Sequence, residues 1–453
     1  MKNLSYILLG VLLLAAAPVW SQAADPAQSA TNVVDHPEDR MQTPPPVTGT
    51  TFPTTLAAEE RSNLLEYGAT FTAAYSDNVL AGLQGHRVSD ISYSIAPTVA
   101  IDVTRPRLHW LGSYAPGFTF YQRSGDLNEA DHNASLDFQF RLSPHVTLNA
   151  RDTFTKSSNV FNQPDFAGTG TVTGGAQVPN FSVIPPIADR LGNSGNVDLT
   201  CQFALNGMIG ASGTFTNLHY PNPSQVPGLF DSSTQGGSAF YSLRISKMHY
   251  VGVTYQYQRL MSYPTTGLSE TQTHAALFYY TVYPTAYSSI SFFGGPQHSD
   301  TVQPPVPPLT TASAMRSWTP AAGASLAWQG RLSTFALSYS HVVAGGGGLA
   351  GAVHMDNATS SIRRQISKTL SGSLGAAYTQ NNVIGDFLGG AYNGHSISGT
   401  AALEQILTPT LSVRLGYTRL HQTYSGITAI GLNPDTNREF ISISYRFARP
   451  LGR

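Results

Sequence analysis

One pattern repeats along almost the whole chain and limits what this sequence can form. From Leu64 onward, an alternating strand, a tight turn and a second alternating strand are followed by a longer loop. Units of this kind are typical of β-hairpins. Apolar residues that alternate with polar residues at a period of two lie on one face of a strand. The repeat therefore predicts an all-β chain of consecutive antiparallel hairpins.

Turn-forming residues divide the predicted strands into pairs. Proline, glycine, asparagine or serine supplies the fixed or positive φ angle, or the side-chain cap, that a tight turn requires. The predicted tight turns are Thr104-Arg105-Pro106-Arg107, Ser143-Pro144-His145, Asn206-Gly207, Ser246-Lys247-Met248, Pro284-Thr285-Ala286, Gln329-Gly330-Arg331, Ser367-Lys368-Thr369 and Thr408-Pro409-Thr410. With the longer loops between them, these turns predict about 18 strands, with both chain ends on the periplasmic, turn side. About 16 strands is the alternative, because alternation is weak near Ser212, Ala358 and Gly394.

The apolar faces of these strands carry large aromatics, which favours a membrane barrel over a soluble sandwich. Ile91, Tyr93 and Ile95 share one face of an early strand, and Leu136 and Phe138 share one face of a later strand. Charged residues make up only 11% of the chain, against about 25% in typical soluble domains. Strands with one face in lipid and the other in water account for both observations. We predict a single up-and-down antiparallel barrel in the bacterial outer membrane, wide enough for an aqueous lumen.

The last predicted strand, Arg438 to Phe447, carries a candidate assembly signal. Its apolar face consists of Ile441, Ile443, Tyr445 and Phe447. This pattern resembles the C-terminal signal of bacterial outer-membrane β-barrels, in which a terminal aromatic follows alternating apolar residues. The resemblance implies recognition by the barrel assembly machinery, and outer-membrane lipid is the other expected partner. Recognition would have to tolerate a short tail, because residues 448–453 follow Phe447.

The chain before residue 64 has a different composition. Residues 1–23 have a positive start, a short apolar core and a small-x-small sequence ending at Ala23, as in a secretory signal peptide. Residues 24–63 are rich in proline and polar residues and are predicted to be a disordered periplasmic leader. The barrel is predicted over 64–447. Cys201 is the sole cysteine, so no internal disulfide forms, and a net charge of −1 offers no basic surface for nucleic acid.

Motifs for catalysis or metal binding are not recognisable in the sequence. The 13 histidines are scattered, without the paired spacing of a zinc site. Ser340 and His341 are neighbours on one strand and so point to opposite faces. Asp131-His132-Asn133 is interpreted as a polar cluster at a strand end, and Gly345–Gly348 as a flexible surface loop. We therefore predict no enzyme activity and no cofactor.

Charged residues on the inward faces of the predicted strands are candidates for lining a pore. Strand parity places six arginines and three acids there, namely Arg141, Arg151, Arg244, Arg363, Arg414, Arg446, Asp137, Asp198 and Glu404. Several of the arginines lie near a tight turn or the chain end, so we predict a positive collar at the periplasmic mouth that favours anions. The alternative is that they pair with the acids or extend away from the pore. Parity also places Phe240 and Phe440 inside, where sugar rings could stack.

Two long loops are predicted at the outer surface. They are Asn159–Gly195 and the proline-rich Pro296–Trp318. Long loops of large barrels either fold inward and narrow the pore or remain outside as mobile segments, and the sequence leaves both possibilities open.

A narrower resemblance is carried by the first barrel strands. The residues are Tyr75-Ser76-Asp77-Asn78-Val79, Ser89-Asp90, Pro97 within Ile95-Ala96-Pro97-Thr98-Val99, Tyr114, Tyr121, and Asp131-His132-Asn133 before Leu136-Asp137-Phe138. They resemble the β-barrel porins associated with exopolysaccharide and exosortase gene clusters, and Tyr-x-Asp-Asn is the most specific motif. The resemblance implies a role in exopolysaccharide production or export, with the polysaccharide or its export proteins as partners.

The predicted function is a porin-like channel for hydrophilic solutes, either a general diffusion channel or an export conduit for an exopolysaccharide. The alternative is a non-conducting structural barrel or an outer-membrane enzyme. Porins often trimerise, but alternation alone identifies no interface for a homo-oligomer.

Overall fold

The computed structural model describes residues 41, 44, 63–80, 86–159, 187–226, 228–305, 312–385, 393–425 and 435–451. The predicted signal peptide, most of the predicted leader and the centre of the loop Asn159–Gly195 lie outside the described residues.

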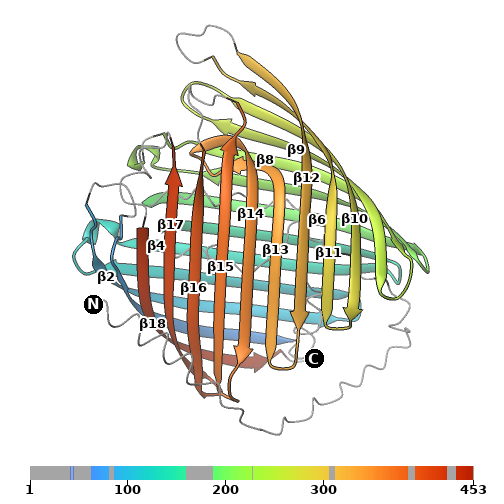
Figure 1. Ribbon diagram of the computed structural model, residues 1–453. Coiled ribbons are helices and arrows are strands. Elements are labelled where there is room, and N and C mark those ends of the chain that lie inside the picture. Colours follow the sequence, from blue (N-terminus) through green and yellow to red (C-terminus); the bar gives the residue numbers. More distant parts are fainter. Residues whose placement is uncertain are drawn as a thin grey trace. The chain divides into compact units, whose positions relative to one another are not determined.

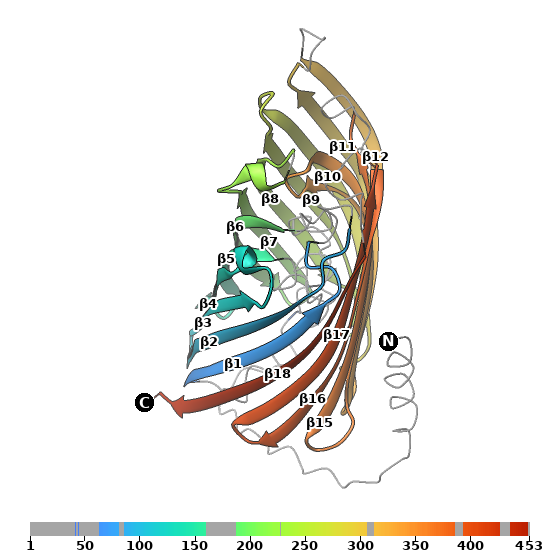
Figure 2. The ribbon, with the colours of Figure 1, turned by 90° about the vertical axis from the view of Figure 1, so that its left-hand side faces the viewer.

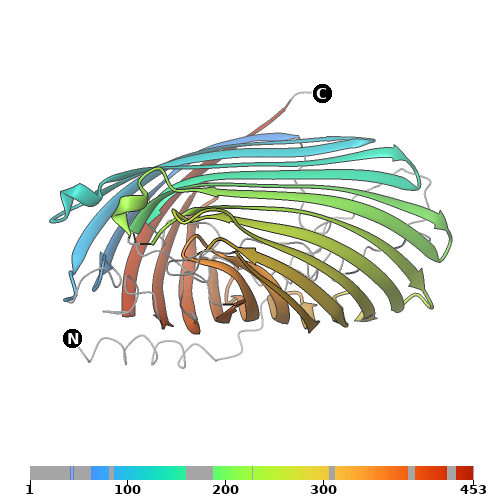
Figure 3. The ribbon, with the colours of Figure 1, turned by 90° about the horizontal axis from the view of Figure 1, so that it is seen from above.

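Eighteen antiparallel strands form one sheet that closes on itself, because β1 pairs with both β2 and β18 (Figures 1 and 3). The strands are β1 Leu64–Ser76, β2 Asp90–Arg105, β3 Leu108–Tyr121, β4 Glu129–Ser143, β5 Val146–Asn159, β6 Ile187–Ala204, β7 Gly207–His219, β8 Asp231–Arg244, β9 His249–Tyr263, β10 Ser269–Thr285, β11 Ser288–Gln303, β12 Ser313–Gln329, β13 Ser333–Gly346, β14 Ala350–Gln365, β15 Leu370–Val383, β16 Asn393–Thr408, β17 Leu411–Tyr424 and β18 Asp435–Pro450. Each strand pairs with its sequence neighbours, so the predicted up-and-down barrel of 18 strands is confirmed.

All the predicted tight turns join consecutive strands at one end of the barrel, which we call the turn end. Local side chains hold these turns. The Ser143 hydroxyl accepts the N–H of Val146 at 3.1 Å, and the Thr408 hydroxyl accepts the N–H of Leu411 at 3.0 Å. The last strand continues three residues beyond the predicted barrel limit, and Pro450 pairs with Leu64 at the same end. The opposite end, where the longer connections lie, is the loop end.

Large apolar side chains cover the outside of the barrel. The exposed fraction is 45% for Phe71, 48% for Ile95 and 52% for Phe292. The predicted assembly residues Ile441, Ile443, Tyr445 and Phe447 lie on this face as well, 38% to 49% exposed. A soluble sandwich would bury such side chains between its sheets. The outside is therefore an apolar surface suited to lipid, and closure leaves no unpaired strand edge.

Hydroxyl groups pair across neighbouring strands on the inner face. Thr70 and Ser444 lie 2.9 Å apart, Ser113 and Ser135 2.6 Å apart. Thr281 and Ser291 repeat the arrangement at 2.7 Å, and the pair is buried. Cross-strand pairs of this kind give each hydroxyl a hydrogen-bond partner on the face of the sheet that is turned away from lipid.

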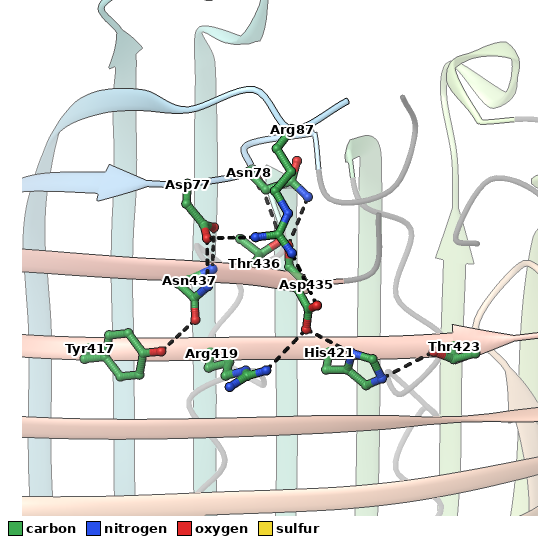
Figure 4. A network of polar contacts seen from close by, with 10 residues as sticks. All are labelled: Asp77, Asn78, Arg87, Tyr417, Arg419, His421, Thr423, Asp435, Thr436 and Asn437. Atoms are coloured by element: carbon green, nitrogen blue, oxygen red, sulfur yellow. Dashed lines mark hydrogen bonds and ion pairs between the residues drawn. The ribbon is translucent and has the colours of Figure 1, made fainter. Parts of the chain in front are cut away.

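Polar contacts at the loop end hold the first and last strands together (Figure 4). Asp77 accepts hydrogen bonds from the backbone N–H and the side-chain amide of Asn437, both at 2.7 Å. Asn78 donates to the backbone carbonyl of Asp435 at 3.0 Å. Arg87 lies 3.6 Å from the Asp77 carboxylate and 3.3 Å from that of Asp435. We call these five residues the seam latch. The Asp-Asn pair of the sequence motif therefore joins β1 to β18.

Candidate functional site: the lumen and its two ends

One part of the lumen carries no charge. The inward-facing side chains of β9 to β13 include no Asp, Glu, Lys, Arg or His within the described strands, and we call this surface the uncharged wall. It consists mainly of hydroxyl, amide, small and aromatic side chains. Most of these residues are buried, as Thr281 (0%), Ser299 (1%) and Leu277 (1%) illustrate.

The inward-facing side chains of β14 to β18 and of β1 to β8 form the other part of the lumen, which we call the charged wall. It contains all nine residues that were predicted to face the lumen: Arg141, Arg151, Arg244, Arg363, Arg414, Arg446, Asp137, Asp198 and Glu404. The Arg151 side chain is 55% exposed and that of Arg363 67%. Solvent therefore reaches these two arginines, although other inward residues of this wall, such as Gln422 and Thr436, are 0% exposed. The effect of these residues on ion selectivity remains a prediction.

Contacts divide the six arginines into three groups. Arg151 pairs with Asp137 at 2.6 Å, and Arg363 approaches Glu404 at 3.9 Å. Buried Arg244 instead donates to the side-chain oxygen of Asn206 at 3.1 Å and to the backbone carbonyl of Leu205 at 2.7 Å, so it supports the neighbouring tight turn. The remaining three form no ion pair with a described residue; they are Arg141, Arg414 and Arg446.

Aromatic rings on the inner face lie against glycines of neighbouring strands. Phe240 packs against Gly210 and Phe440 against Gly416, because only a residue without Cβ leaves space there. Phe240 is also covered by Met41, and the Arg414 guanidinium lies 5.8 Å from the centre of the Phe440 ring. Both rings face inward as predicted; Phe240 is buried, whereas Phe440 is only half-buried.

A further charged group at the loop end of the lumen was not among the predicted site residues. Arg438 of β18 faces inward, and the charges of Glu129 and Asp131 on β4 act on it together with Tyr121. His132 points outward and lies 2.8 Å from the Tyr114 hydroxyl. The predicted polar cluster Asp131-His132-Asn133 is therefore divided between the two faces of β4, as alternation requires.

The connection between β13 and β14 crosses the loop end of the lumen. We call residues 345–349 the glycine strap. The Tyr220 hydroxyl donates to the carbonyl of Gly347 at 2.7 Å, and the N–H of Phe230 donates to the carbonyl of Gly348 at 2.9 Å. Leu349 is buried in an apolar cluster with Tyr220, Val226 and Leu229 of the β7–β8 connection. The strap thus leaves its own strands and docks near β7 and β8 (Figures 1 and 2).

Glycine is required in the strap for two reasons. Gly347 and Gly348 have φ angles of +67° and +87°, which L-residues rarely adopt. A Cβ on Gly348 would also lie 2.8 Å from the carbonyl oxygen of Phe230 and would clash with the Tyr220 ring. The prediction of a flexible surface loop was wrong, since residues 346–350 are buried. The apolar residues on both sides of the glycine run, from Val342 to Ala344 and at Leu349, were the available signal.

Other strand ends pack against the base of the strap. The N–H of Ile384 donates to the carbonyl of Ala352 at 3.0 Å, and the Gln303 amide donates to the carbonyl of Ile384 at 3.1 Å. Ile384 and Ala352 form a buried cluster with Val343 and with Leu260 of β9. The strap is therefore attached to the uncharged wall at its base and to the β7–β8 connection at its tip.

At the turn end, one described residue of the predicted leader contacts the lumen wall. Met41 is 9% exposed and packs with Met208, Phe240 and Tyr250. Its backbone N–H donates to the side-chain oxygen of Gln202 at 3.1 Å. Apolar contacts with the lumen wall are therefore made at both ends, by the glycine strap at the loop end and by Met41 at the turn end.

The described residues contain neither a cluster of metal ligands nor a membrane-spanning helix. No group of His, Cys, Asp or Glu is arranged to hold a metal ion. No helix in this part of the chain is long and apolar enough to cross a membrane.

A closed barrel of 18 strands with an apolar outside and a polar lumen satisfies every backbone group within a bilayer, and an even number of strands is typical of bacterial barrels. The protein is an outer-membrane β-barrel. No family model and no curated protein sequence matches the chain.

Several solved structures show a weak overall similarity to this chain. Pseudomonas aeruginosa OccK2 (OpdF), crystallised with glucuronate, is 9% identical, with a TM-score of 0.42 over 86% of this chain and 98% of its own. The ferric citrate transporter FecA is 9% identical, with a TM-score of 0.41 over 84% and 78% of the two chains. Acinetobacter baumannii OccAB2 is 11% identical, with a TM-score of 0.39 over 85% and 98%.

Proposed function

We propose that this outer-membrane barrel is a porin-like channel for hydrophilic solutes, with a preference for anions. The observation that carries the proposal is the charged wall, on which Arg151 and Arg363 are exposed and Arg141, Arg414 and Arg446 form no ion pair with described residues. Fixed positive charge along a narrow aqueous path lowers the energy of an anion more than that of a cation. The turn end is proposed to face the periplasm, as the short turns of bacterial barrels do.

Acidic saccharides are the solute class that we propose. A guanidinium binds a carboxylate through charge-assisted hydrogen bonds, and the hydroxyl and amide groups of a lumen wall can replace water around sugar hydroxyls. The sequence resemblance to porins of exopolysaccharide gene clusters supports the same class. Export of a polysaccharide would require the glycine strap to leave the mouth, because its buried apolar contacts cross the loop end.

Single-channel conductance across a planar bilayer with a salt gradient tests the proposal. We expect an anion-selective conductance that falls when an oligomer of a uronic acid is added and that a neutral oligosaccharide of equal length affects less. A folded barrel with a steady cation-selective conductance would contradict it.

A non-conducting barrel is the second candidate, and the buried contacts of the strap and of Met41 favour it. It predicts no conductance from a heat-modifiable, folded barrel, both in the wild type and after the strap has been released by substitution. Conductance that appears only after release would instead identify a closed channel.

A further inference from the structure

Histidines gather on the outward face in the loop-side half of the strands. They are His132, His219, His274, His298, His341, His354, His395 and His421. Several contact a tyrosine or an acid, as at 2.7 Å between His274 and Tyr255, and at 2.9 Å between His341 and Asp356. Rings with one polar end suit the boundary between lipid and water. This histidine belt places the membrane interface near the loop end.

His421 differs from the other members of the belt. Its Nδ1 lies 3.0 Å from the Asp435 carboxylate, and its Nε2 lies 3.3 Å from the Thr423 hydroxyl (Figure 4). Within the described strands, no other histidine of the belt has a carboxylate at one ring nitrogen and an aliphatic hydroxyl at the other. An acid, an imidazole and a hydroxyl in this order form the arrangement that activates a hydroxyl as a nucleophile.

The strands position the three groups by simple alternation. His421 and Thr423 are two residues apart on β17 and so share its outward face. Asp435 is the register partner of His421 on β18. Arg419 and Arg87 also contact the Asp435 carboxylate, at 3.4 and 3.3 Å, and help to fix its position. The Thr423 side chain is exposed, whereas 28% of the Asp435 side chain is exposed, so the hydroxyl is the accessible member.

We propose that Thr423, His421 and Asp435 form a hydrolytic site for the acyl esters of lipids at the loop-side membrane interface. The Thr423 hydroxyl oxygen bonds to the ester carbonyl carbon, and its proton passes to Nε2 of His421. The tetrahedral intermediate expels the alcohol, which takes that proton and leaves an acyl-threonine. A water molecule, deprotonated by His421, attacks the acyl-threonine, and the proton returns to Thr423 as the fatty acid leaves. One water is consumed for each ester cleaved.

Neighbouring residues supply the other requirements of such a site. His395 faces Thr423 directly across β16 and β17, and its ring centre lies 5.7 Å from that of His421. An imidazole N–H at this position can donate a hydrogen bond to the developing oxyanion. Ile397 and Ile441 are outward and 46% and 44% exposed, so an acyl chain has an apolar surface beside the site. Asp435 is a positioning residue, which holds the Nδ1–H tautomer of His421.

The test uses the full chain refolded in detergent micelles and a phospholipid with a fluorescent acyl chain, with released fatty acid as the readout. Thr423→Val keeps the shape but removes the hydroxyl, and His421→Gln removes the base. We expect both to lower the rate at least about 100-fold, the scale of general acid–base catalysis. Thr423→Ser should retain activity. His341→Gln is the matched control, because His341 contacts Asp356 without a hydroxyl at its other nitrogen.

Heat-modifiability on gels establishes that every variant is folded. For Asp435→Asn, a positioning role predicts a lower kcat with an unchanged KM for the same phospholipid, which a loss of fold would not produce. The inference is overturned if the wild type releases no fatty acid, if Thr423→Val keeps the wild-type rate, or if only a short, water-soluble ester is cleaved.

Discussion

The two walls of the lumen are built on the same hairpin repeat, yet they differ in charge and in the burial of particular side chains. On the uncharged wall Thr281 and Thr301 are 0% and 3% exposed, whereas on the charged wall the Arg363 side chain is 67% exposed. The residues beside the glycine strap pack on Leu260 of the uncharged wall, and Leu349 of the strap packs on the β7–β8 connection. Met41 contacts both walls, at Tyr250 and at Phe240. An uncharged surface can be covered at little cost, but covering an arginine without a partner removes its hydration. On both walls the segments that cover the lumen therefore pack on apolar side chains.

The strongest test of this difference introduces one charge on each wall. Ser299 and Ser444 are both members of hydroxyl pairs, with Ser317 at 2.7 Å and Thr70 at 2.9 Å, but Ser299 is only 1% exposed. Ser299→Asp should lower the free energy of unfolding by about 3 to 5 kcal/mol, the cost of an unpaired buried charge. Ser444→Asp, beside solvent-accessible arginines, should change it by less than about 1 kcal/mol. Urea unfolding in lipid vesicles measures both, and equal midpoints would show that the walls do not differ in burial.

Release of the strap should open the loop end. Leu349 is 4% exposed, and Leu349→Ala should weaken strap docking by about 2 kcal/mol, the lower end of the range for buried leucine. That energy corresponds to a roughly 30-fold larger population of the undocked strap. Mean conductance in a planar bilayer should rise accordingly. Leu337→Ala, at an exposed outward position of β13, is the matched control. Unchanged conductance in Leu349→Ala would mean that the strap does not limit the channel.

The seam latch should contribute to stability without affecting the lumen. Asp77 accepts two hydrogen bonds from Asn437, and Asp77→Ala should lower the free energy of unfolding by about 1.5 to 3 kcal/mol, as expected for bonds to a charged group. Ion selectivity should stay at the wild-type value because Asp77 faces outward. Thermal unfolding followed by gel mobility checks the first expectation and reversal potentials the second. A change in selectivity would place Asp77 on the ion path.

Removal of the unpaired arginines should have the smallest effect. Simultaneous replacement of Arg141, Arg414 and Arg446 by glutamine should lower the anion-to-cation permeability ratio by a few-fold, which is about 1 kcal/mol or less. Arg244→Gln is the contrasting variant, because Arg244 is buried against Asn206 and should affect stability and leave selectivity unchanged. Equal ratios in the wild type and the triple variant would show that a positive collar does not act on ions.

The outline of the barrel could be predicted because its determinants are local. Each tight turn is specified by one to four residues, and Ser143 and Thr408 hold their turns through hydroxyls within three residues. The inward position of Arg141 or Glu404 follows from the period of two alone. The lumen was harder to predict, since strand parity shows to which face a side chain points but not which other residues contact it.

Contacts between distant segments were beyond sequence reasoning. Gly345–Gly348 have the composition of a mobile loop, yet Tyr220, more than a hundred positions earlier, binds the carbonyl of Gly347. The motif around Asp77 and Asn78 was recognised only as a resemblance, and its partner Asn437 lies near the other end of the chain. Histidines that appeared scattered in the sequence form a belt, because the barrel brings positions of equal height on separate strands to one level.

The sequence by itself determined the hairpin repeat, the turn end and the face of each strand, and limited the strand number to about 16 or 18, because period and turn chemistry act over a few residues. The tertiary structure decided which wall residues are covered, where the strap docks, how the seam is held and which histidine meets both an acid and a hydroxyl. These features depend on closure of the sheet, which joins β1 to β18 and brings together side chains that no local pattern relates.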